Sequence, residues 1–305
     1  MRALNIDASG DLVENWVGWF APRRQPFLVE SGLAASMDLR SERSPLPAEL
    51  RDTYEVYDLP EGLGFAWLDE EQFLSLPRTG RAAMVRAQRR FGREHVPSVK
   101  AWASLLGNQA REQADGHRFV WWPSLLVGME QQVLTDYIEQ GRRPSRHDVV
   151  PDHTWTGVMD LLPGAQLMAG RFATASGPNC FGTVMAAAGV PGADSVWMQR
   201  EPFEHWLTES ARTGGSDTDP GTVMVWRSRD GLAQHAAVTI GSGWALHKPS
   251  QGWFDPVKIL SISDVKRSAR SVGRLLQRYA LGAPDNARTG YRLIGRSVKR
   301  DRAYV

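Results

Sequence analysis

Three residues in the second half of the chain have the types and the order that nucleophilic catalysis needs: Cys180, His235 and His247. Cys180 is the only cysteine; it follows a predicted turn at 176–179 and precedes small residues that predict a buried helix. A thiol at a helix N-terminus lies in the partial positive charge of the backbone dipole, which favours the thiolate. A buried, inert thiol is the alternative interpretation of a lone cysteine.

The two histidines belong to a predicted pair of antiparallel strands that follows the cysteine. His235 opens one strand, and His247 lies twelve residues later, across a predicted hairpin turn at 241–243. Neighbouring positions of such a pair share one face of the sheet, so the two imidazoles can meet. An imidazole oriented by a third polar group can take the proton of a thiol. The order therefore predicts a nucleophile, a general base and an orienting residue.

The elements around these residues predict an α+β domain, with helices first and an antiparallel meander after them. An apolar stripe over 265–281 lies opposite four arginines, which predicts an amphipathic helix with a basic face. Its arginines are Arg267, Arg270, Arg274 and Arg278. The expected strands cover 222–227, 235–240, 244–247 and 257–262.

A polar, proline-bounded segment at 141–151 marks the expected boundary between two domains. We expect residues 1–150 to form a mostly helical domain that helps to shape the substrate cleft. We expect residues 151–305 to form the catalytic domain, which ends in the basic C-terminal helix and tail.

Composition excludes several classes of protein. The chain has 305 residues, of which 42% are hydrophobic and 23% are charged, and this excludes wholesale disorder. A single cysteine excludes an intramolecular disulfide framework and a multi-cysteine metal site. The net charge of +2 conceals a basic end, since twelve basic and three acidic residues lie from Lys258 onward. Such an end can bind RNA or an acidic partner, or dock on the chain's own acidic part, which we favour.

No motif in the sequence indicates a membrane span, a cofactor site or a metal site. Neither a leader-like start nor a run of about 20 apolar residues occurs, so we expect a cytoplasmic protein without a membrane span. No phosphate-cradling or dinucleotide-binding motif occurs, and we expect no cofactor. His147 and His153, with their neighbouring aspartates, lack a recognised ligand spacing, so we expect no metal site.

The segment that carries the candidate triad resembles the NlpC-type cysteine peptidases of the papain-like superfamily. The similarity covers about residues 160–265 and lies in the strings NCFG, PGTVMVWR and QHAAVTIGSGWALH. It implies a papain-like fold with Cys180 as nucleophile, His235 as general base and His247 as the orienting residue. Asn179 and Phe181 stand where the family usually has Asp and Ser, so we expect a substrate other than cell-wall peptide.

We therefore expect acyl transfer from an amide or ester through a thioester intermediate. Water as acceptor would make the chain an amidase or peptidase, and an amine would make it an acyltransferase. Ser176, Asn179 and Trp244 are expected to contact the substrate; 248–251 could line the cleft or form only a turn, which we favour. The competing hypothesis is a catalytically silent papain-like module that binds RNA or an acidic partner through its basic C-terminal helix.

Overall fold

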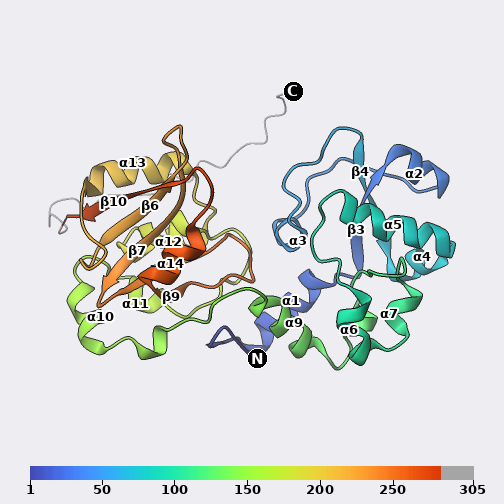
Figure 1. The fold of residues 1–305 in the computed structure, drawn as a ribbon, viewed down its shortest axis with the longest axis horizontal. Helices are drawn as coiled ribbons and strands as arrows, with labels where there is room; N and C mark the ends of the chain where they lie inside the picture. The colour runs from blue at the N-terminus through green and yellow to red at the C-terminus, as the bar shows by residue number, and fades with distance from the viewer. Residues whose placement is uncertain (283–305) are drawn as a thin grey trace. The chain divides into compact units, whose positions relative to one another are not determined.

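The computed structural model describes residues 1–282, which form two compact units (Figure 1). Unit 1 comprises Met1–Pro144 together with two short segments, Phe172–Ser176 and Gly252–Asp255. Unit 2 comprises Ser145–Arg171, Gly177–Gln251 and the chain from Pro256 onward. The chain thus passes between the units five times, whereas the sequence pattern indicated one boundary near residue 150.

Unit 1 consists of short helices with two small antiparallel sheets. Strand β1 (Arg2–Ala3) pairs with β2 (Ile6–Asp7), and β3 (Arg24–Glu30) pairs with β4 (Leu63–Asp69). The helices are α1 (Gly10–Phe20), α2 (Ser31–Ser36), α3 (Ala48–Tyr54), α4 (Glu70–Ser75), α5 (Arg78–Arg90), α6 (Val99–Leu106), α7 (Gln109–Glu112), α8 (Pro123–Leu126) and α9 (Glu130–Glu139).

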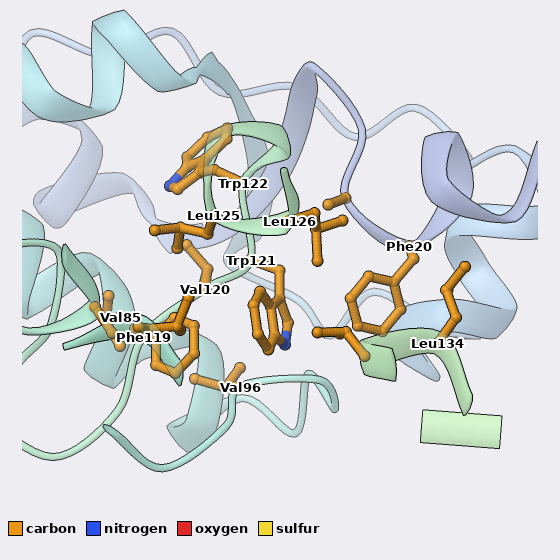
Figure 2. Close-up of a cluster of buried hydrophobic side chains, with 14 of the residues drawn as sticks. Phe20, Val85, Val96, Phe119, Val120, Trp121, Trp122, Leu125, Leu126 and Leu134 are labelled. Carbon is orange, nitrogen blue, oxygen red and sulfur yellow. The ribbon is translucent and has the colours of Figure 1, made fainter. Parts of the chain in front are cut away.

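The core of unit 1 combines aliphatic side chains with many aromatic ones, and Figure 2 shows part of it around Phe20, Trp121 and Trp122. Trp253 comes from the inserted segment 252–255 and is fully buried in this core. Its Nε1 donates a hydrogen bond to Thr53 Oγ1 at 2.9 Å, and its ring centroid lies 5.6 Å from that of Trp16. The inserted segment is therefore a core element of unit 1 and not a surface loop.

Unit 2 is built on a six-stranded antiparallel sheet with the order β5-β10-β6-β7-β8-β9. Helices accompany this sheet, and the unit confirms the predicted α+β class. The strands are β5 (Ala211–Thr213), β6 (Thr222–Arg227), β7 (Ala233–Gly241), β8 (Trp244–His247), β9 (Lys258–Ser261) and β10 (Leu275–Leu281). The helices are α10 (Asp152–Val158), α11 (Ala165–Met168), α12 (Cys180–Ala187), α13 (Arg200–Ser210) and α14 (Ile262–Ala269), with 3-10 turns η1 (His147–Val149) and η2 (Ala193–Ser195).

At β6 and β7 both faces of this sheet are buried, because alternate residues of a strand point to opposite sides. Ala236 and Val238 of β7 belong to the core that contains the side chains of α12 and α13. Ala237 belongs to a second core, formed with Val265 and other residues of α14. The strand at the centre of the candidate site is thus held from both sides.

The prediction of an amphipathic helix over 265–281 is wrong from Arg270 onward. Helix α14 ends at Ala269, a turn follows in which Gly273 has a φ of 81°, and 275–281 form β10. This segment pairs with both β5 and β6, and non-local pairing of this kind overrides a local helical pattern.

The four arginines of the predicted basic face consequently do not share a helix. Arg267 lies on α14, and Arg270 and Arg274 lie in the turn that follows it. Arg278 lies on β10, where its Nε is 2.9 Å from Asp217 Oδ1. The remaining basic tail, from residue 283 onward, lies outside the described residues.

Gly182 in α12 provides a test of how tightly this helix packs. A Cβ at this position would overlap the carbonyl oxygen of Ala193, whereas a Cβ at Gly157 in α10 would meet nothing within 4 Å. We predict that Gly182→Ala lowers the free energy of unfolding by about 1–3 kcal/mol. The control Gly157→Ala should leave it unchanged or raise it by up to about 1 kcal/mol, since alanine favours helix. Urea denaturation measures both variants, and equal effects would contradict the packing described.

Candidate functional site

The start of α12 determines the position of the candidate nucleophile. Cys180 is the first residue of the helix, and Asn179 is its N-cap. Asn179 Oδ1 accepts a hydrogen bond from the N–H of Gly182 at 3.1 Å, and its Nδ2 donates to the carbonyl of Met198 at 2.8 Å. The capping interaction satisfies one of the free N–H groups of the first turn. It therefore fixes the residue at which the helix begins.

The thiol of Cys180 lies among backbone N–H groups but is nearly buried, at 8% exposure. Burial raises the pKa of the Cys180 thiol to about 11. The backbone N–H groups of Ala236, Phe181 and Cys180 itself act in the opposite direction, as does the charge of Lys248. Desolvation thus outweighs the helix dipole, and the expected thiolate gives way to a protonated thiol at neutral pH.

His235 and His247 are brought together by the pairing of β7 with β8. Their Nε2 atoms are 2.8 Å apart, and their rings lie edge to face with centroids at 4.9 Å. Continuing the register in which Val238 faces Leu246 places His247 opposite Ala237, so His235 is its diagonal neighbour. Long or aromatic side chains can meet at this diagonal spacing. The small side chain of Ala237 leaves room for both rings.

His247 is held in the neutral form. Burial lowers its pKa well below the usual value, and His235, Lys258 and Lys248 act in the same direction. Lys258 is the residue directly paired with His247 between β8 and β9. A neutral imidazole can offer a lone pair at Nε2, so His247 can accept a hydrogen bond from Nε2–H of His235.

Cys180 and His235 are related through strand β7, because the residue that follows His235 contacts the thiol. The Cys180 thiol is close to the N–H of Ala236, the residue that follows His235 in β7. Because Nε2 of His235 faces His247, a proton from the thiol would have to reach its Nδ1, the ring nitrogen nearer the backbone. The rings of Trp226 and His235, paired between β6 and β7, lie 5.5 Å apart. All three predicted residues thus belong to unit 2, and the two histidines are in contact.

The three expected substrate contacts have other neighbours in the structure. Ser176 Oγ accepts a hydrogen bond from the N–H of Trp253 at 3.2 Å, within unit 1. Asn179 caps α12, and Trp244 begins β8 and packs against the core of unit 2. Their contact with a substrate stays a prediction.

Sequence reasoning did not predict that two lysines beside His247 are buried. Lys248 and Lys258 are 1% and 2% exposed. Residues 248–250 form a loop, in agreement with the turn interpretation, but that interpretation did not predict a buried lysine. Two sequence features could have indicated their burial. Lys248 directly follows an expected buried strand, in HKP, and Lys258 lies inside the apolar run VKIL.

The described part of the chain has neither a cluster of metal ligands nor a helix that could span a membrane. No group of three or more His, Cys, Asp or Glu side chains among residues 1–282 could hold a metal ion. Within the same residues, no helix has both the length and the apolar character needed to cross a membrane.

The raised pKa of Cys180 predicts the pH dependence of its alkylation. Only the thiolate reacts, so below about pH 11 the rate should rise about tenfold per pH unit in the substrate-free protein. Mass spectrometry after timed exposure to iodoacetamide between about pH 6 and 10 measures this rate, with the urea-unfolded chain as control. A rate that levels off below about pH 8 in the folded protein would show that the thiolate is already formed.

Comparison with known proteins identifies no relative of this chain. No protein-family model, no curated protein and no solved structure matches the chain.

Proposed function

We propose that the chain catalyses acyl transfer from an amide or ester through a thioester on Cys180. The observation that carries the proposal is the 2.8 Å contact between Nε2 of His235 and Nε2 of His247. Ala236, whose N–H lies beside the Cys180 thiol, follows His235 in the same strand. A thiol, a base and a residue that orients the base form the unit that activates a cysteine nucleophile. The same helix-and-meander arrangement supports a papain-like fold of the NlpC type for unit 2.

The first step requires His235 to hold its lone pair at Nδ1. In that state its Nε2–H donates a hydrogen bond to Nε2 of His247, which burial and the two lysines keep neutral. Because the thiol is protonated at neutral pH, its proton moves to Nδ1 of His235 as Sγ attacks the carbonyl carbon. His247 then stabilises the imidazolium by accepting its other N–H.

Negative charge develops on the former carbonyl oxygen in the tetrahedral intermediate. The backbone N–H groups of Cys180 and Phe181, which lie beside the thiol at the start of α12, are suited to stabilise it, since they carry the positive end of the helix dipole. When the intermediate collapses, the leaving amine or alcohol takes the proton from Nδ1 of His235, and the acyl group stays on Sγ. Water or a second amine then attacks the thioester, gives its proton to His235, and releases the thiol.

The competing hypothesis of a binding module depended on a continuous basic helix at 265–281. The described residues do not form this helix, because its second half is β10. Arg278 forms an ion pair with Asp217 on the sheet. No observation among residues 1–282 therefore favours RNA or an acidic partner over cysteine chemistry.

Turnover of p-nitrophenyl acetate tests the proposed roles. Cys180→Ala should abolish turnover, and His235→Ala should lower kcat/KM by about 10²–10⁴-fold, the usual contribution of a general base. His247→Asn should retain more activity than His247→Ala, because an amide oxygen can still accept from His235.

The matched control is His205→Ala, which removes an exposed histidine of α13. This variant should have wild-type kcat/KM. If His205→Ala and His235→Ala gave the same activity, the proposed base would be wrong.

A further inference from the structure

Two exposed apolar residues lie on the loop that joins η2 to α13. Val196 and Trp197 are 40% and 43% exposed, whereas the next residue, Met198, is buried. An indole ring offers a large, rigid apolar surface with one polar N–H, and such rings dominate many recognition sites. The position of this pair relative to Cys180 therefore matters.

The loop is held against the first turn of α12 at three points. Asn179 Nδ2 donates to the carbonyl of Met198 at 2.8 Å. A Cβ on Gly182 would overlap the carbonyl of Ala193 and would reach Met198 Cβ at 3.5 Å. A Cβ on Gly177 would lie 3.8 Å from the backbone nitrogen of Trp197. These contacts precede and follow Cys180 in sequence, so the loop is anchored beside the nucleophile.

The side of α12 that faces α13 is also apolar. Phe181, the residue after Cys180, stacks on Phe203 with ring centroids 4.4 Å apart and an interplanar angle of 19°. Both rings are buried, and they belong to the same core as Met198. This aromatic stack therefore fixes α12 against α13, on the element that follows the loop of Val196 and Trp197.

We propose that Trp197, together with Val196, forms a subsite for an apolar group attached next to the carbonyl that Cys180 attacks. The inference rests on the proposed function. It restricts the substrates of that function to amides or esters that carry an aliphatic or aromatic group next to the reacting carbonyl. Trp197 is thus a specificity-determining residue, and the proton transfers do not involve it.

Alkylation of Cys180 tests this subsite without requiring turnover, because Cys180 is the only thiol of the chain. The probes are iodoacetamide and N-hexyliodoacetamide, which differ only in the apolar chain. Wild type should prefer the hexyl reagent, and Trp197→Ala should lose about tenfold or more of this preference. Trp197→Phe should keep most of it, because the phenyl ring preserves an apolar surface.

The control is Leu167→Ala, which removes a 64% exposed apolar side chain from α11. Helix α11 lies at the opposite end of α12, where the N–H of Gly164 donates to the carbonyl of Ala187 at 3.0 Å. Leu167→Ala should leave the ratio of the two alkylation rates unchanged.

A second pair of probes, p-nitrophenyl hexanoate and acetate, places the apolar group on the acyl side. Loss of chain preference in Trp197→Ala with either pair of probes supports the subsite. Wild-type preference retained in Trp197→Ala with both pairs, or no preference in wild type, would overturn it. Absence of ester turnover by wild type would instead overturn the proposed function, and the alkylation ratio would still decide the subsite.

Discussion

The direct packing of the first turn of α12 on strand β7 determines the chemistry of the candidate site. Ala236 makes this contact possible, since it presents only a methyl group in β7. On another side of the same turn, Gly182 admits the carbonyl of Ala193 in η2. The packing sets the Cys180 thiol beside the N–H of Ala236, next to the candidate base. It also excludes water from the thiol, and desolvation raises the thiol's pKa. Position and protonation state therefore have the same cause.

Burial acts on the nucleophile and on the orienting histidine in complementary ways. It keeps Cys180 protonated, so that a base must act during attack, and it keeps His247 neutral, so that it can accept from His235. Lys248 opposes the first condition and supports the second, since its charge lowers both the pKa of the Cys180 thiol and the pKa of His247. A solvated arrangement of the same residues would weaken each of these effects.

Local sequence patterns predicted the elements of the site better than their surroundings. The helix start at Cys180 and the strands of 222–227 and 244–247 follow from turn residues and periodicity, and the structure has them at those residues. The periodicity of 265–281 is typical of a helix, but residues 275–281 form a strand because they pair with β5 and β6. The core position of Trp253 and the buried lysines depend on contacts distant in sequence, which no local pattern records. The thiol's protonation state likewise depends on tertiary burial.

The most direct test of the account is to look for an acyl group on the sulfur of Cys180. Wild-type protein is mixed with p-nitrophenyl acetate, quenched in acid to preserve a thioester, digested, and analysed by mass spectrometry. We predict one acetyl group on the peptide that contains Cys180, removable by hydroxylamine and absent from His235→Ala treated in parallel. An unmodified Cys180 in wild-type protein that nevertheless turns over the ester would contradict it.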